Sequence, residues 1–200
     1  MKLLLVADSV HEALYTHFDR DRWSDVDLIL SAGDLKAEYL SFLVTLINGA
    51  PLYYVRGNHD KRYEQRPPLG CEDIHGRIVN FKGLNILGLE GSNWYNGQGI
   101  QYRERQMKWQ VLKVLPHLLF NRDIDIILTH APPAGFHDSN KSSHRGFDIF
   151  RYLIDKLNPD YFIHGHIHMS YTRDDRIIEY KDTKIINAYQ YYELDLDREN

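Results

Sequence analysis

Short apolar runs rich in valine, isoleucine and leucine recur along the chain, and each one stops at glycine or at a polar residue. They read KLLLVA, VDLILSA, PLYYVR, LNILGLE, IDIILTH and DYFIHGH. Runs of this length are typical of buried strands, although periodicity alone does not exclude short buried helices. Two segments between the runs carry apolar residues at helical spacing: Leu40, Leu43, Val44 and Ile47 in the first, and Met107, Val111, Val114, Leu115 and Leu118 in the second.

The order of these elements predicts the class of fold. From residue 1 to about residue 54 the pattern is strand, helix, strand, helix, strand, with the first helix in HEALYTHF (11–18). Such alternation indicates an α/β protein with parallel strands.

The pattern changes after Gly76. Two pairs of short runs are joined there by Lys82-Gly83 and by Lys181-Asp182, which predicts hairpins. We expect loops over 60–75 and 131–144. Because no repeat or linker divides the sequence, we expect a single domain over residues 1–200.

Composition limits the partners and the compartment. The chain has 200 residues, of which 43% are hydrophobic and 26% charged, which suits one globular core. The net charge of -4 provides no basic field and counts against nucleic acid as a partner. Its single cysteine, Cys71, fits a reducing compartment, and no run approaches the roughly 20 apolar residues of a membrane span. We therefore expect a cytoplasmic protein with no membrane partner.

Polar residues stand where the predicted strands end. They are Asp8, Gly33-Asp34, GNHD (57–60), His130 and HGHIH (164–168). Ligands of open α/β sheets bind beyond the carboxyl ends of the strands, so these residues are expected to meet at one rim.

Each of these residues also has an ordinary structural interpretation. Asp34 could cap the following helix, His130 could be a loop histidine, and Asn58 and Asp60 could be turn residues. His164 lies inside its strand, and we interpret it as a core histidine. Together the residues favour function, because Gly-Asn-His-Asp alone is expected by chance in roughly one such sequence in a thousand.

The donor types indicate a metal site. Imidazole, carboxylate and amide oxygen without thiolate form a mixed set that suits Mn, Fe, Zn, Co or Ni. Two such ions roughly 3.5 to 4 Å apart can hold a phosphoryl group and generate hydroxide near neutral pH. A carboxylate can bridge two cations, and Asp34 is the natural candidate.

These motifs, in this order, resemble those of the calcineurin-like metallophosphoesterases, in particular the small single-domain, phosphodiesterase-like members. The similarity runs from Asp8 to His168, and THAPPAGFHD, GHIH and TKIINA contribute to it. It implies an α/β fold with a four-layer α/β/β/α sandwich, in which two mixed sheets are flanked by helices.

The resemblance also implies a role for each motif residue. One metal would be held by Asp8, Asp34 and His168, and a second by Asp34, Asn58, His130 and His166. Manganese is the first choice of metal. His59 would assist the leaving group during attack by a hydroxide that bridges the metals, and Asp60 would orient the imidazole of His59.

The sequence departs from the family pattern at its first motif. The family's first histidine falls at position 10, where this chain has Val10, a side chain that cannot bind a metal. Either His11 replaces it through an altered loop, or the first site lacks a protein ligand and completes its shell with water. We favour the second alternative, because no glycine or proline follows the strand to absorb an inserted residue.

Two arginines are candidates for contact with substrate. Arg56 precedes GNHD and could meet a phosphate or be an ordinary arginine at a strand end. Arg145 lies in a loop, 132–146, that could close over the substrate, and its guanidinium suits phosphate. The expected function is a metal-dependent phosphoesterase, most simply a phosphodiesterase acting on a small phosphorylated compound or phosphodiester. The alternatives are a scaffold that has lost catalysis and a nuclease.

Overall fold

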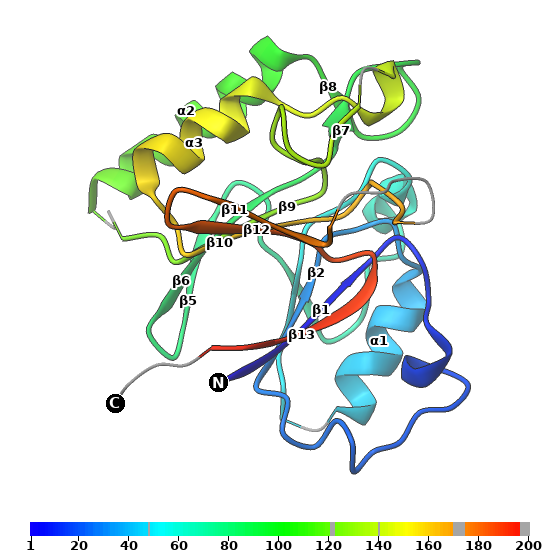
Figure 1. The fold of residues 1–200 in the computed structure, drawn as a ribbon. Helices are drawn as coiled ribbons and strands as arrows, with labels where there is room; N and C mark the ends of the chain where they lie inside the picture. Colours follow the sequence, from blue (N-terminus) through cyan, green and yellow to red (C-terminus); the bar gives the residue numbers. More distant parts are fainter. Residues whose placement is uncertain (48, 121–122, 140, 170–174, 197–200) are drawn as a thin grey trace.

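Two β-sheets pack face to face in the computed structural model, which describes all residues except 48, 121–122, 140, 170–174 and 197–200 (Figure 1). In the first sheet the strands follow the order β13 (Gln190–Asp195), β1 (Lys2–Ala7), β2 (Leu28–Ser31), β3 (Leu52–Tyr54) and β4 (Cys71–Asp73). In the second the order is β11 (Ile177–Tyr180), β12 (Thr183–Asn187), β10 (Tyr161–His164), β9 (Ile126–Thr129), β6 (Leu84–Leu89) and β5 (Ile78–Phe81).

Helices flank the two sheets. They are α1 (Ala37–Leu46), α2 (Glu104–Phe120) and α3 (Asp148–Leu157), with three short 3-10 helices in the described loops, η1 (Glu12–Leu14), η2 (Asp60–Glu64) and η3 (Ser142–His144). A small parallel pair, β7 (Ser92–Asn93) and β8 (Gln101–Tyr102), contacts η3 and α2. Within the described ranges, no helix is long and apolar enough to span a bilayer.

The parallel pairing of β1, β2 and β3 and the two hairpins follow the sequence prediction, and the remaining pairs extend both sheets. β1, β2, β3 and β4 are parallel, as are β6, β9, β10 and β12. The two predicted hairpins are β5–β6, which turns at Lys82-Gly83, and β11–β12, which turns at Lys181-Asp182. Lys82 and Lys181 have positive φ angles of 47° and 56°, as a tight turn between antiparallel strands requires.

The core has three apolar layers that separate four layers of secondary structure. Leu3, Leu30, Ile86 and Leu128 are among the buried residues between the sheets. A second cluster fills the space between the first sheet and α1, and a third fills the space between the second sheet and helices α2 and α3. The predicted four-layer α/β/β/α sandwich is therefore confirmed.

The first predicted helix, over residues 11–18, is wrong in extent. Only the 3-10 turn η1 forms there, with the Nδ1 atom of His11 accepting the N–H of Ala13 as its cap. The carbonyl of Ala13 accepts the indole N–H of Trp23, and the N–H of His17 donates to the carbonyl of Glu12. These bonds replace those that would continue an α-helix.

Two further segments differ from expectation. The predicted loop 60–75 contains η2 and the short edge strand β4, and β13 was not predicted. Strand β13 pairs antiparallel with β1, although the two strands lie near opposite ends of the sequence. Its sequence, QYYELD, is mostly half-buried and lacks the continuous apolar pattern of a central strand.

Arg56 joins the two sheets beside their carboxyl ends. It follows β3 in the first sheet, whereas Glu90 follows β6 in the second. The guanidinium donates from Nε to Glu90 Oε2 over 2.7 Å and from a terminal nitrogen to Oε1 over 3.1 Å. Glu90 is 2% exposed and also accepts the hydroxyl of Tyr102. This buried pair gives Arg56 a structural partner that requires no phosphate.

Removing Arg56 should destabilise the fold. The variant Arg56→Met leaves the Glu90 charge buried without its partner, so we expect the free energy of unfolding to fall by about 3 kcal/mol. The double variant with Glu90→Leu should lose less than the sum of the two single losses. Urea denaturation measures these changes. Arg22→Met, which removes an exposed arginine paired with Glu193, serves as the control and should change stability little; equal effects at both arginines would contradict this assignment.

Candidate metal centre

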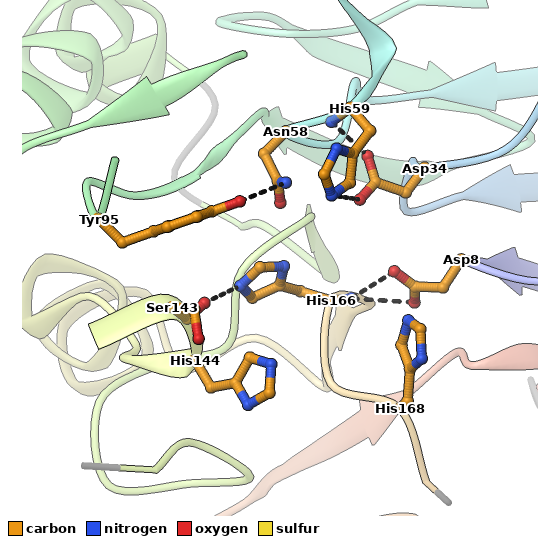
Figure 2. A pocket seen from close by; sticks show the side chains of 9 residues that line it. All are labelled: Asp8, Asp34, Asn58, His59, Tyr95, Ser143, His144, His166 and His168. Carbon is orange, nitrogen blue, oxygen red and sulfur yellow. Dashed lines mark hydrogen bonds and ion pairs between the residues drawn. The ribbon is translucent and has the colours of Figure 1, made fainter. Parts of the chain in front are cut away.

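A pocket of about 300 Å³ lies at the carboxyl ends of the parallel strands (Figure 2). The residues that line it are Asp8, Asp34, Asn58, His59, Tyr95, Ser143, His144, His166 and His168. They come from loops far apart in the sequence, which the strand order brings to one rim. This is the position expected for a ligand site in an open α/β sheet.

Glycines allow these loops to touch. A Cβ atom on Gly33 would overlap the backbone of Gly57, and a Cβ on Gly57 would overlap the Asp34 carboxylate. A Cβ on Gly165 would lie 2.9 Å from Asp8 Oδ2. The glycines of the three sequence motifs therefore provide the space for close approach of backbone and carboxylate.

Several of the candidate ligands have unusual backbone conformations. The φ angles of Asp8, Asp34 and His166 are 64°, 57° and 67°, in the left-handed region that residues with a side chain rarely adopt. Such conformations concentrate at functional sites, where the surrounding structure fixes them.

Asp34, Asn58 and His130 converge on one point. Nε2 of His130 lies 3.0 Å from Asn58 Oδ1 and 3.4 Å from Asp34 Oδ2. Nδ1 of His130 lies 2.7 Å from the carbonyl oxygen of Ala32 and donates to it, so Nε2 is the atom that faces Asp34 and Asn58. A partner of this kind on the far nitrogen is a common feature of histidine ligands.

The electrostatics of this group favour a cation. Burial alone would lower the pKa of His130, but the Asp34 carboxylate outweighs burial and raises that pKa to about 9. Burial likewise opposes the charge on Asp34, yet His130 lowers the pKa of the carboxyl to about 2. The acceptors that hold a proton on His130 would also attract a divalent ion at the same point.

His166 has its Nδ1 atom available to bind a metal beside Asp34 and His130. Its Nε2 lies 2.6 Å from the carbonyl oxygen of Ser143 and donates to it, which leaves Nδ1 as the acceptor. Burial, together with the neighbouring His130, lowers the pKa of His166 to about 3, so the imidazole is neutral. Neutral imidazole is the form that binds metals. Ligand atoms of Asp34, His130 and His166 all lie within 4.8 Å of one another.

Asp8 and His168 lie next to each other on the opposite side of His166 from Ser143 (Figure 2). The Asp8 carboxylate accepts the N–H of His166 over 2.9 and 3.0 Å, and His168 stacks on Tyr189 with ring centroids 4.8 Å apart. Burial raises the pKa of Asp8 to about 7, and the Asp34 carboxylate adds to that effect. A cation beside Asp8 would offset this cost and favour its ionised form.

The structure thus brings the six predicted ligands to one site, with His130 behind the pocket surface and the other five lining it. The predicted ligands are Asp8, Asp34, Asn58, His130, His166 and His168. All offer oxygen or imidazole nitrogen, so the donor set fits the proposed divalent transition metals. Their assignment to individual ions stays a prediction.

His59 lies in the pocket, but Asp60 does not have the predicted contact with it. The His59 side chain is 76% exposed and its Nε2 is 4.0 Å from Asp34 Oδ2. The Asp60 carboxylate instead accepts the backbone N–H groups of Gly57 and Asp34, over 2.8 and 2.7 Å. The expectation that Asp60 orients the imidazole is therefore corrected: Asp60 holds the two loops together.

The position of His11 shows whether this residue can replace the ligand missing at position 10. This histidine caps η1, and its ring packs edge-on against Tyr191 with centroids 4.7 Å apart. It is not among the pocket residues, and Val10 is 39% exposed. The geometry favours the alternative in which no histidine replaces the ligand missing at position 10.

The two predicted substrate arginines do not line the pocket. Arg56 pairs with Glu90, and Arg145 is exposed at the end of η3. The loop 132–146 contributes Ser143 and His144 instead. Sequence reasoning placed that loop near the site, but no spacing signal distinguished His144 from Arg145 within it.

His164 is a core histidine, as predicted. It is fully buried, and its Nε2 lies 2.8 Å from Nδ1 of His137, whose Nε2 in turn contacts the carbonyl oxygen of Asp175 over 2.7 Å. Tyr95, in contrast, is a pocket residue that the sequence did not assign. Its hydroxyl accepts the amide N–H of Asn58 over 3.3 Å.

Comparison with known proteins agrees with this geometry. A UPF0046 protein of Caenorhabditis elegans is 25% identical over 95% of this chain and 70% of its own length. Human metallophosphoesterase domain-containing protein 1 is 26% identical over 50% of this chain and 30% of its own length. The crystal structure of TT1561 of Thermus thermophilus has a TM-score of 0.65 at 15% identity and covers 94% of this chain and 88% of its own, which shows a shared fold. The model of the calcineurin-like phosphoesterase family matches residues 1–170, and the chain belongs to that family.

Proposed function

We propose that this chain is a metal-dependent phosphodiesterase that uses two divalent transition metal ions, with manganese as the first candidate. The observation that carries the proposal is the convergence of carboxylate, amide and imidazole acceptors beside a pocket that holds the exposed His59. Family membership supports metal-dependent hydrolysis of phosphoesters. The preference for diesters is our inference.

Each ion would have its own set of ligands around the shared Asp34. The first set is Asp8, Asp34 and His168, and the second is Asp34, Asn58, His130 and His166. When bound, two such ions neutralise phosphoryl oxygens and lower the pKa of an attacking water. The protein holds its ligands in place through the carbonyls of Ala32 and Ser143, which fix the two imidazoles.

His59 would act on the leaving oxygen. Its backbone N–H donates to Asp34 Oδ1 over 2.7 Å, which fixes the residue beside the shared carboxylate, while its imidazole remains exposed. An imidazole in this place can donate a proton to the departing alkoxide.

The substrate would be a small phosphodiester. Because the His59 side chain is 76% exposed, the pocket mouth admits a diester whose second substituent extends into solvent. The net charge of -4 gives no long-range attraction for nucleic acid. We place the protein in the cytoplasm, which suits its one cysteine, the half-buried Cys71, whose pKa burial raises to about 11.

Metal titration should show two unequal sites. The first set has one protein ligand fewer than the second, because Val10 cannot bind a metal and His11 points elsewhere. Isothermal titration of Mn²⁺ into chelator-stripped protein is therefore expected to give one tight and one weaker site. The variant His11→Ala serves as the control and should leave both affinities unchanged. Two equally tight sites, or a loss of one site in His11→Ala, would show that the first site is complete.

Hydrolysis should depend on His59. With Mn²⁺ and diphenyl phosphate, whose phenol is a poorer leaving group than p-nitrophenol, we expect kcat of His59→Ala to fall by about 100-fold or more, because the leaving oxygen loses its proton donor. The affinity for Mn²⁺ should remain unchanged, since the imidazole is not among the ligands. His17→Ala, which removes a histidine of similar exposure that does not line the pocket, is the matched control.

The same assay tests the alternatives. Full activity of His59→Ala would refute its role, whereas absence of hydrolysis by the native chain with every divalent metal would leave a scaffold as the function. Salt-dependent binding of oligonucleotides would favour a nuclease.

A further inference from the structure

We propose that Tyr95 is a functional residue of this site: it positions the Asn58 ligand and donates a hydrogen bond to a non-bridging oxygen of the substrate phosphate. The inference rests on the proposed function. It concerns a residue outside every strand-end motif, held over the pocket from the loop between β7 and β8.

The Asn58 amide is held by contacts at both of its ends. Asn58 is 1% exposed, and its two amide atoms face different partners. Nδ2 donates to the hydroxyl of Tyr95 over 3.3 Å, whereas Oδ1 lies 3.0 Å from Nε2 of His130. If the amide were rotated by half a turn, two N–H groups would point at the metal ligands. The hydrogen bond to the Tyr95 hydroxyl holds the Nδ2 end of the amide in place and so restrains the whole side chain.

The Tyr95 hydroxyl also has one proton to donate. The Tyr95 oxygen accepts the amide N–H of Asn58, so the hydroxyl proton is directed away from Asn58. Phenols have pKa values near 10 and remain protonated at neutral pH. The hydroxyl lines the pocket together with His59 and Asp34 (Figure 2). A phosphate oxygen in that pocket is an acceptor of the right charge.

The loop that carries Tyr95 is held in place by one side chain. The side-chain oxygen of Gln101 accepts the backbone N–H groups of Tyr95, Asn96 and Gly97, over 3.1, 3.3 and 3.1 Å. One side chain therefore fixes the backbone of the whole turn. A donor held in advance at its working position costs no reorganisation when substrate binds.

The loop is also attached to Asn58 itself. The N–H of Ile100 donates to the carbonyl oxygen of Asn58 over 3.1 Å, and a Cβ atom on Gly99 would overlap that same oxygen. Tyr95 and Asn58 are thus joined through both backbone and side chain. This double attachment is what a positioning residue requires.

His59 and Tyr95 would then act on different oxygens of the substrate phosphate. His59 donates a proton to the leaving oxygen, whereas Tyr95 donates a hydrogen bond to an oxygen that stays on phosphorus. Loss of His59 should therefore cost most with poor leaving groups, and loss of Tyr95 should cost the same for all leaving groups.

The test is the variant Tyr95→Phe, which removes one oxygen and keeps the ring. We expect kcat for bis(p-nitrophenyl) phosphate with Mn²⁺ to fall about tenfold or more, and by an equal factor across aryl diesters whose phenols differ in pKa. The affinity of the tighter Mn²⁺ site should weaken about tenfold, since the Asn58 amide loses its orienting partner. The thermal midpoint and circular dichroism should match those of the native chain.

Tyr15→Phe is the matched control, because Tyr15 is 50% exposed and packs against Phe42 and Tyr39 beside α1. It should leave kcat and Mn²⁺ affinity unchanged. Unchanged kcat and Mn²⁺ affinity in Tyr95→Phe would overturn the inference, and a kcat loss that grows with the pKa of the leaving phenol would overturn the assignment to a non-bridging oxygen. If the native chain hydrolyses no diester, the proposed function fails, while an unchanged Mn²⁺ affinity of Tyr95→Phe would separately refute the positioning of Asn58.

Discussion

Close contact between the loops after β2 and β3 is the constraint on which the site depends. Neither Gly33 nor Gly57 has room for a Cβ atom, because each position faces the opposite loop. The Asp60 carboxylate closes the contact by accepting one backbone N–H from each loop. Asp34 is thereby held at the centre of the site in a left-handed conformation that an unconstrained aspartate rarely adopts. The geometry of the proposed shared ligand is thus a consequence of backbone packing.

Three of the other proposed ligands are held in the same way, by a second contact on the side chain. For His130, His166 and Asn58, a second group binds the end of the side chain opposite the proposed metal-binding atom: the carbonyls of Ala32 and Ser143, and the hydroxyl of Tyr95. The two carbonyls determine which imidazole nitrogen can bind a metal, and the Tyr95 hydroxyl restrains the Asn58 amide. The loops between strands therefore supply both the ligands and the groups that orient them, which explains why distant segments meet at this rim.

Local patterns in the sequence predict the site residues that directly follow a strand. Asp8, Asp34 and His130 each follow an apolar run, so the strand order alone brought them together, and the hairpins could be read from their turns. Sequence reasoning failed where a role depends on a distant partner. The ion pair of Arg56 is with a residue 34 positions away, and β13 pairs with the first strand of the chain. No local pattern encodes such pairings, nor the contact of Tyr95 with Asn58.

The most direct test of the central claim is the position of bound metal. Anomalous X-ray diffraction at the manganese edge, from crystals equilibrated with Mn²⁺, locates each ion. The account predicts two peaks that share Asp34 as a ligand, with the stronger near Asn58, His130 and His166 and the weaker near Asp8 and His168. Peaks confined to other parts of the molecule, or no peak at this rim at saturating Mn²⁺, would contradict it.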